Sequence, residues 1–374
     1  MHLSYCTNVH PAEDLDGVIR QLREAAGPVR RAAGLAVLGV GLWLPAPLAA
    51  RLASEPEALA RLRGTLDDEG LEVRTLNAFP YEAFHAEVVK LDVYRPDWTD
   101  PARLEYTVDA ARVLAALLPD GADGSISTLP LGWRDGWDAA ADRAATDALA
   151  ALGAELRAIR AETGRTIRLA VEPEPGCTLD DVDDVVAWLA ARRDRLDLDL
   201  IGVCLDTCHL AVSFADPAEA VERIAAAGLR VVKVQASAAL HVERPADADA
   251  RRAVGAYAED RYLHQVREDA PGGVIRVDDL PEALAELPAT APWRVHFHVP
   301  LHLVPEPPLA STTDVLRTAL AAVRAVQDVD QVHLDVETYT WSVLPGAPVD
   351  LVDGIAAELR WAHAELLEGA EQPA

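Results

Sequence analysis

The 374-residue sequence is poor in cysteine and in basic residues. Its four cysteines (Cys6, Cys177, Cys204 and Cys208) form no CxxC pair, which argues against a disulfide framework and against a structural zinc site. Lys and Arg number 34 against 61 Asp and Glu, giving a formal net charge of -27 at pH 7. A field of this sign repels phosphate backbones and anionic lipids, so we expect no nucleic-acid partner.

Long apolar runs and a dinucleotide-binding motif are also missing. The run over residues 35–53 is interrupted by two prolines and an arginine before ~20 apolar residues accumulate, so we expect no direct membrane insertion. Gly39 and Gly41 lie in this run, but the third glycine of a Rossmann motif is absent. The N-terminal residues lack the charged and apolar regions of a secretory signal, which together with the sparse cysteines favours a cytoplasmic location.

What the sequence does contain is an alternation of short apolar runs with helical segments rich in Ala, Leu, Arg and Glu. The predicted strands cover residues 3–6, 35–42, 72–79, 124–131, 167–173, 201–206, 230–237 and 331–338. The predicted helices cover residues 13–26, 55–69, 101–118, 139–163, 180–193, 216–227, 312–325 and 350–368. This number and spacing predict an α/β fold of the (β/α)8 TIM-barrel type, with a doubly wound sheet as the alternative.

Two segments are too long to be simple connections. Residues 80–100 form an aromatic loop after the third strand, and residues 238–311 contain Pro and Gly throughout. Long loops in compact domains usually serve as lids or binding loops. We therefore expect one barrel over residues 1–368 that carries an extended loop or lid at 238–311. Within that loop, residues 293–303 resemble a strand, and residues 369–374 are expected to form a flexible tail.

Carboxylates occur where several predicted strands end. Glu172 ends the fifth strand and Glu337 the eighth. Asp206 ends the sixth strand, and His209 follows three residues later. Barrel strands end at one mouth, where carboxylates repel one another unless a cation or protons intervene. Oxygen and imidazole ligands together suit Mn2+, Zn2+ or Mg2+. The alternative is that Asp206 only caps the following helix and His209 lies in its first turn.

Four motifs carry a resemblance to a known family. The segments "LAVEPEPG", "VCLDTCH", "VKVQAS" and "HLDVETYTW", in that order and at barrel spacing, resemble the xylose-isomerase-like superfamily of sugar phosphate isomerases and epimerases, which includes endonuclease IV. The segments "LNAFPY", "FHVPL" and "VETYTWSVLP" are similar to those of the Ebo-cluster metabolite traffic proteins. The likeness extends from "LSYCTNVHP" to about residue 365.

The resemblance implies a metal site. Glu172, Asp206 and Glu337 match the positions that ligate one divalent metal ion in the superfamily. Gln235 stands where the superfamily usually has a histidine, and its amide oxygen is a weaker ligand. His209 would contact substrate or a second metal. Two further histidines lie where endonuclease IV-like members have Asp-x-His, and we assign them to the metal, with substrate hydrogen bonding or packing as the alternatives: His296 and His298.

Other polar residues are weaker candidates. Lys233 could neutralise an enediolate, although a lysine whose stem packs against the core is commoner. Asn77 could donate to a substrate hydroxyl, and its alternative is a turn residue. The remaining candidates for substrate binding are histidines with loop, surface or packing roles as alternatives: His10, His264 and His302.

These residues favour an isomerase or epimerase that acts on a small polyhydroxylated metabolite. A metal ion would polarise a carbonyl, Glu172 and Glu337 would remove and return a proton on the adjacent carbon, and His209 and Lys233 would assist. A dehydratase needs the same metal and base. A metabolite-binding or traffic protein that lost turnover is the alternative from another class, and Gln235 supports it. An abasic-site nuclease has the fold, but its groove needs basic residues that the loops lack.

Overall fold

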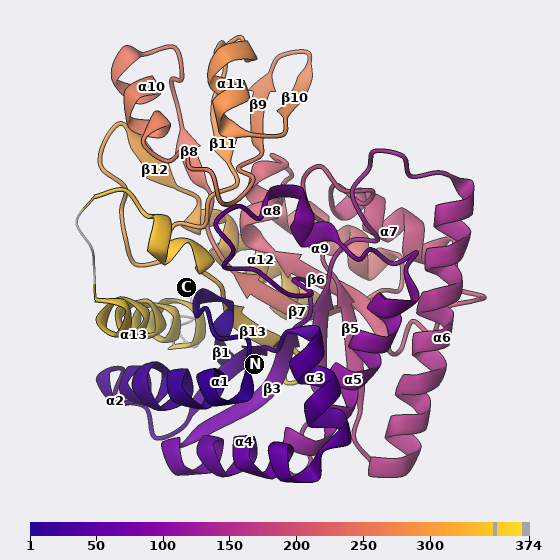
Figure 1. The fold of residues 1–374 in the computed structure, drawn as a ribbon. Helices are drawn as coiled ribbons and strands as arrows, with labels where there is room; N and C mark the ends of the chain where they lie inside the picture. The colour runs from indigo at the N-terminus through magenta and orange to yellow at the C-terminus, as the bar shows by residue number, and fades with distance from the viewer. Residues whose placement is uncertain (347–349, 369–374) are drawn as a thin grey trace.

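The computed structural model describes residues 1–346 and 350–368, so the tail expected at 369–374 lies outside the described residues. Within them, eight parallel strands close a barrel in the order β1-β13-β7-β6-β5-β4-β3-β2 (Figure 1). The strands are β1 (His2–Cys6), β2 (Leu38–Trp43), β3 (Leu71–Asn77), β4 (Gly124–Thr128), β5 (Ile167–Val171), β6 (Ile201–Asp206), β7 (Val231–Ala236) and β13 (His333–Val336). Each falls on a predicted strand, so the TIM-barrel prediction is confirmed and the doubly wound alternative is wrong.

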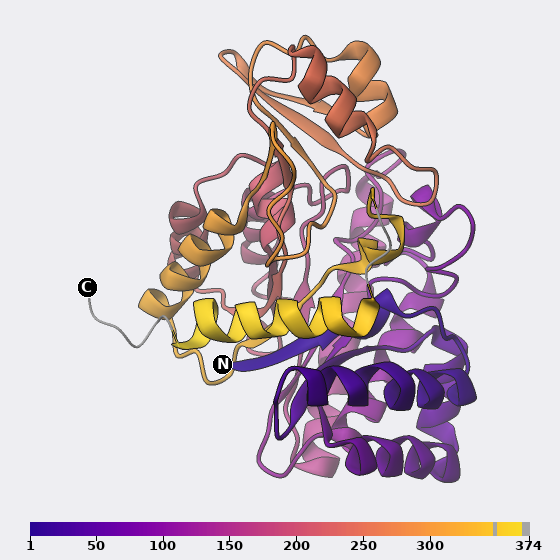
Figure 2. The ribbon, with the colours of Figure 1, turned by 90° about the vertical axis from the view of Figure 1, so that its left-hand side faces the viewer.

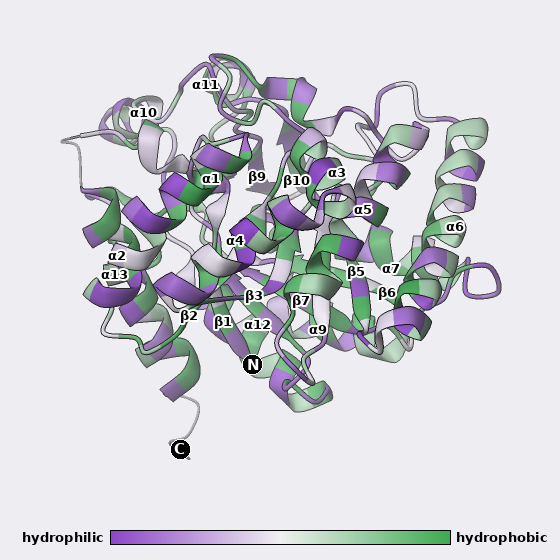
Figure 3. Cartoon of the chain, turned by 60° about the horizontal axis from the view of Figure 1, so that its bottom comes forward, coloured by the Kyte–Doolittle hydropathy of each residue, from purple (hydrophilic) through white to green (hydrophobic). Residues whose placement is uncertain are grey.

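Helices cover the outside of the barrel, and hydrophobic residues gather on the strands and on parts of the helices (Figure 3). They are α1 (Leu15–Gln21), α2 (Gly27–Ala32), α3 (Ala46–Ser54), α4 (Pro56–Glu69), α5 (Pro101–Leu117), α6 (Ala139–Thr163), α7 (Val182–Ala190), α8 (Thr207–Val212), α9 (Pro217–Ala226), α12 (Thr313–Val326) and α13 (Leu351–Ala362). Aspartates cap several of them, such as Asp138 at α6 and Asp216 at α9. In the described part of the chain, the search for a helix of bilayer-spanning length and apolarity found none.

Residues 240–311, between β7 and β13, fold into a small antiparallel sheet with two helices. Its strands, in the order β10-β9-β11-β8-β12, are β8 (Leu240–Val242), β9 (Val266–Ala270), β10 (Gly273–Val277), β11 (Trp293–Val295) and β12 (Leu309–Ser311). The helices are α10 (Ala248–Gly255) and α11 (Leu280–Glu286). A separate apolar core around Trp293 and Phe297 holds this insertion together. Because it leaves the barrel at the C-terminal end of β7, it stands over the barrel mouth (Figures 1 and 2).

The barrel interior below the mouth contains a buried ion pair, whereas most TIM barrels are filled with Val, Ile and Leu. Lys233 Nζ lies 2.8 Å from Asp335 Oδ2, and both side chains are completely buried. Ser4 Oγ donates to Asp335 Oδ1 at 2.6 Å. Gly41 on β2 makes room for this carboxylate, since a Cβ atom at that position would lie 2.2 Å from Asp335 Oδ2. The glycine therefore serves close packing inside the barrel.

Candidate active site

Three carboxylates meet at the C-terminal mouth of the barrel. Asp206 is the last residue of β6, and Glu172 and Glu337 directly follow β5 and β13. One oxygen from each lies within 4.8 Å of the other two, and all three side chains are buried. Burial, together with the charges of neighbouring carboxylates, raises the pKa of Glu172 well above its ordinary value. The convergence expected from the strand ends is therefore present in the structure.

Asp206 uses its two oxygens differently. Oδ1 accepts from the backbone N–H of His209 at 2.9 Å, which caps α8, and from Ser237 Oγ at 2.8 Å. Oδ2 is buried and has no hydrogen-bond partner among the described residues. The helix-capping interpretation of Asp206 is thus confirmed for one oxygen, while the other oxygen stays free for a ligand in the site.

Glu337 is oriented by two amides. Asn8 Nδ2 and Asn77 Nδ2 both donate to Glu337 Oε1, at 2.7 and 2.8 Å. Burial, reinforced by the charge of Asp206, raises the pKa of Glu337 to about 8. Asn77, expected to bind substrate, therefore lines the pocket and also fixes this carboxylate.

His298 reaches the carboxylates from the insertion. Its Nδ1 lies 2.7 Å from the backbone carbonyl of Glu337, and a carbonyl only accepts, so the ring proton is on Nδ1. Nε2 consequently carries a lone pair. It lies 4.0 Å from Asp206 Oδ2 and has no hydrogen-bond partner in the described chain. Burial lowers the pKa of His298, which keeps the imidazole neutral and able to ligate a metal.

The donor atoms fit a divalent cation. Buried polar atoms nearly always have partners, yet several atoms at this floor have none among the described residues, including the possible metal donors Glu172 Oε2, Asp206 Oδ2, Gln235 Oε1 and His298 Nε2. Gln235 pairs with Asp206 in the β6–β7 register, so its amide lies beside the carboxylates. Three oxygens and one imidazole nitrogen suit Mn2+, Zn2+ or Mg2+. A cation would also relieve the repulsion between the carboxylates.

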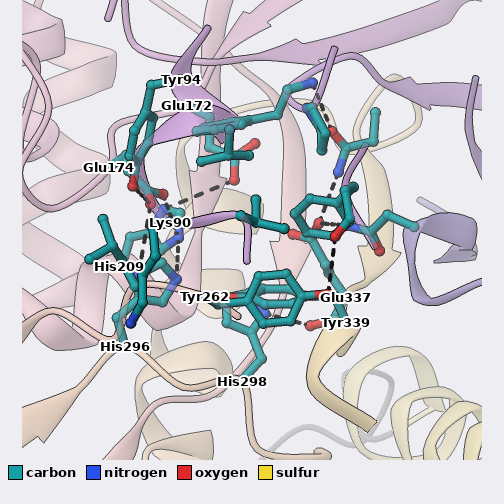
Figure 4. Close-up of a pocket in the computed structure, with 18 residues that line it drawn as sticks. Lys90, Tyr94, Glu172, Glu174, His209, Tyr262, His296, His298, Glu337 and Tyr339 are labelled. Atoms are coloured by element: carbon teal, nitrogen blue, oxygen red, sulfur yellow. Dashed lines mark hydrogen bonds and ion pairs between the residues drawn. The ribbon is translucent and has the colours of Figure 1, made fainter. Parts of the chain in front are cut away.

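A second group of titratable side chains lies beside the first. His209 Nε2 is 2.9 Å from Glu174 Oε2 and 3.1 Å from His296 Nε2 (Figure 4). Burial alone would lower the pKa of His209, but Asp206 and Glu174 outweigh it and the pKa is raised well above the ordinary value. His209 is therefore protonated at neutral pH and donates from Nδ1 to the carbonyl of Pro173 at 2.8 Å.

Glu174 is a site residue that the sequence reasoning missed. It accepts a hydrogen bond from Tyr94 Oη at 2.9 Å and lines the pocket with Glu172. The signal was present in "EPEP", because two glutamates two apart in an extended segment point the same way. The segment follows the strand and carries prolines, so the alternation did not stand out.

Besides Asp206 and Gln235, which lie next to the lining carboxylates, four of the expected residues do not line the pocket in the described structure. Lys233 lies deeper in the barrel, paired with Asp335. His10 Nε2 contacts Tyr5 Oη at 3.1 Å. His264 lies between Glu259 and the carbonyl of His296, and the ring of His302 stacks on Trp341. Substrate contact by any of these residues would need a rearrangement.

The pocket lies between this polar floor and an apolar roof. It is lined by residues from the barrel, from the 80–100 loop and from the insertion. The roof consists of residues from the 80–100 loop and of Tyr262 and Leu263 from the insertion. Backbone hydrogen bonds from Val89 and Lys90 to the carbonyl of Arg261 join loop and insertion, at 2.8 and 2.9 Å.

The raised pKa of Glu337 predicts a pH effect on the metal-free protein. Between its ordinary value near 4.5 and about 8, the folded state binds more protons than the unfolded chain, so the free energy of unfolding falls as pH rises. We expect EDTA-treated protein to melt at a lower temperature at pH 8.0 than at pH 5.5. Glu337→Gln should melt with a shallower pH dependence. Thermal melts at both pH values test this, and equal slopes in the two proteins would contradict it.

Comparisons with known proteins agree with this fold. A family model described as xylose isomerase-like TIM barrel matches residues 29–256. A xylose isomerase-like TIM barrel protein from Mycobacterium smegmatis in complex with magnesium has a TM-score of 0.56 at 15% identity, covering 99% of this chain and 98% of that chain. The IolI protein with a bound zinc atom has a TM-score of 0.52 at 12% identity, covering 98% of this chain and 100% of that chain. The D-allulose 3-epimerase of Methylomonas sp. in complex with D-allulose has a TM-score of 0.50 at 14% identity, covering 98% of this chain and 97% of that chain. No curated protein matches the chain. The chain belongs to the xylose isomerase-like TIM barrel family.

Proposed function

We propose that the protein is a metal-dependent isomerase or epimerase that acts on a sugar or cyclitol with a carbonyl group. One observation carries the proposal: Glu172 and His298, which line the pocket, and Asp206, which lies beside Glu172, each have a buried donor atom without a partner among the described residues. The metal complexes and the epimerase among the structural neighbours are consistent with it.

Five residues would hold the metal ion, and two of them would also transfer protons. Glu172, Asp206, Gln235, His298 and Glu337 would hold the ion, which when bound polarises a substrate carbonyl and acidifies the adjacent C–H bond. β6 and β7 separate β5 from β13 in the barrel, so Glu172 and Glu337 approach the floor from different sides. One is placed to accept a proton at its carboxylate oxygen and the other to return it.

The surrounding contacts support these roles. The two amides on Glu337 Oε1 leave its other oxygen to face the pocket. Protonated His209 places a positive charge beside the floor and can donate a hydrogen bond to a substrate oxygen in place of His296.

Solvent-deuterium exchange tests the proposal. Protein loaded with Mn2+ is expected to exchange the proton next to the carbonyl of a ketose such as D-fructose, detected by NMR or mass spectrometry. EDTA should abolish the exchange, and so should Glu172→Gln, which removes the base without changing its shape. Full exchange in either condition would contradict the proposal.

A binding or traffic protein of the Ebo type is the second candidate. The observation that favours it is Gln235, an amide where an ionisable ligand is usual, with both amide atoms partnerless in the described structure. In this case the protein would bind the same metabolite tightly and show no exchange with any metal.

A further inference from the structure

The roof of the pocket indicates what kind of substrate fits it, provided that the proposed function holds. We propose that the substrate joins a polyhydroxy carbonyl head to an uncharged apolar or aromatic substituent, rather than to a phosphate. The inference is drawn from the two unlike faces of the pocket and from the absence of a free cation on either face among the described lining residues.

The polar face binds the head. It comprises carboxylates, imidazoles and amides from the barrel and from the stretch after β11: Asn8, Asn77, Glu172, Glu174, His209, His296, His298 and Glu337. The lining also includes apolar and aromatic side chains, here called the wall: Phe79, Pro80, Phe84, Val89, Val93, Tyr94, Tyr262, Leu263 and Tyr339. Two of them adjoin the polar residues, Tyr94 at Glu174 and Tyr339 at His298. A free sugar has hydroxyls around its whole length, so one end of it would lie against this wall without hydrogen-bond partners.

The rings of the wall present their apolar surfaces. Phe84, Tyr262 and Tyr339 form a cluster with ring-centroid separations of 4.9 to 5.5 Å. Tyr262 Oη donates to the carbonyl of Phe84 at 3.3 Å, and Tyr94 Oη donates to Glu174. These two hydroxyls are therefore engaged within the protein. An aryl or alkyl group placed here would pack against ring faces and edges.

A phosphate at the wall would find no unpaired lysine or arginine among the described lining residues. Lys90 is the single Lys or Arg among the described residues that line the pocket. Its Nζ lies 2.6 Å from Oδ2 of Asp279, a residue of the insertion. The lining carboxyl groups of Glu172, Glu174 and Glu337 offer an anion no positive charge either. Phosphate sites in proteins use arginine, lysine or a row of backbone N–H groups.

Three related probes test the inference with the metal-loaded protein: D-fructose, D-fructose 6-phosphate and 6-O-benzyl-D-fructose, which differ only at one end. Binding is measured by calorimetry, and turnover separately by deuterium exchange. Burying the benzyl group should tighten binding about 30-fold relative to D-fructose. The phosphate should bind more weakly than D-fructose.

Variants show whether the wall is responsible. Phe84→Leu, and Phe84→Ala if it folds, should remove most of the benzyl preference, read as the ratio of the two Kd values. Tyr81→Ala is the matched control, because Tyr81 lies in the same loop with its ring on Tyr106, outside the pocket lining. This control should keep the preference.

The possible outcomes separate the two proposals. Phosphate binding tighter than D-fructose, or benzyl binding no tighter than D-fructose, overturns the substituent inference even where exchange is observed. A benzyl preference without exchange for any probe supports the substituent inference and rejects the proposed reaction. A preference that survives in both Phe84 variants places the substituent elsewhere and overturns the role of the wall.

Discussion

Asp206→Asn should lower the affinity for Mn2+ more than about 100-fold while the fold persists, because it removes a direct ligand. Losing only a supporting contact of a ligand costs about 10–100-fold in metal affinity. The side-chain oxygen of Asn can still accept from His209 N–H and Ser237 Oγ, as Asp206 Oδ1 does. The amide NH2 then replaces Oδ2 and directs two donor hydrogens into the cation site. Calorimetric titration of EDTA-treated protein with Mn2+ measures the change.

The control uses another helix cap. Asp216 Oδ1 caps α9 through Ala218 N–H and Glu219 N–H, and its side chain is exposed to solvent, whereas the three carboxylates of the site are buried. Asp216→Asn should therefore leave Mn2+ affinity unchanged. Undiminished Mn2+ binding in Asp206→Asn, with a melting temperature close to that of the parent, would remove Asp206 from the ligand set.

Lys233→Met should destabilise the protein by about 3–5 kcal/mol, the usual cost of leaving one charge of a buried pair without its partner. Lys233 and Asp335 are both fully buried and 2.8 Å apart. Without the ammonium, Asp335 keeps only its bond from Ser4 Oγ in a region that already holds other carboxylates. Urea unfolding followed by circular dichroism measures the loss.

The double variant decides the cause. Lys233→Met combined with Asp335→Asn removes both charges and keeps the acceptor for Ser4, so it should recover much of the stability lost in the single variant. Arg157→Met, which breaks a largely exposed ion pair with Asp197, should change stability by no more than about 1 kcal/mol. A Lys233→Met variant as stable as this surface control would show that the buried pair contributes little.

The barrel could be predicted from the sequence because each of its strands is a buried run between amphipathic helices. Most of the insertion could not: residues 293–303 were expected to be strand-like and begin with β11, but β8 and β12 are three residues long, too short for a period of two to show. β10 is also largely exposed and offers no apolar pattern. Residues 240–311 therefore looked like a loop and contain a folded sheet.

Part of the candidate site could be predicted from the sequence for a related reason. Strand ends point into one mouth, so Glu172, Asp206 and Glu337 could be grouped from the chain alone. The sequence did not show how deep in the barrel each side chain lies. Lys233 and Gln235 share one face of β7, yet Lys233 lies one pleat lower and reaches Asp335. The partners of His264 depend on how the insertion packs, and local sequence does not encode this.

His298 lies three residues beyond β11, the central strand of the insertion sheet, whereas Glu172 and Asp206 belong to the barrel. An ion shared by these side chains would join two separately packed cores. Linkage is reciprocal, so the ion would favour the docked insertion by the same free energy by which docking tightens the ion. Metal binding at the mouth would thus stabilise even the edge strands of the insertion sheet, β10 and β12, which contain none of the ligands.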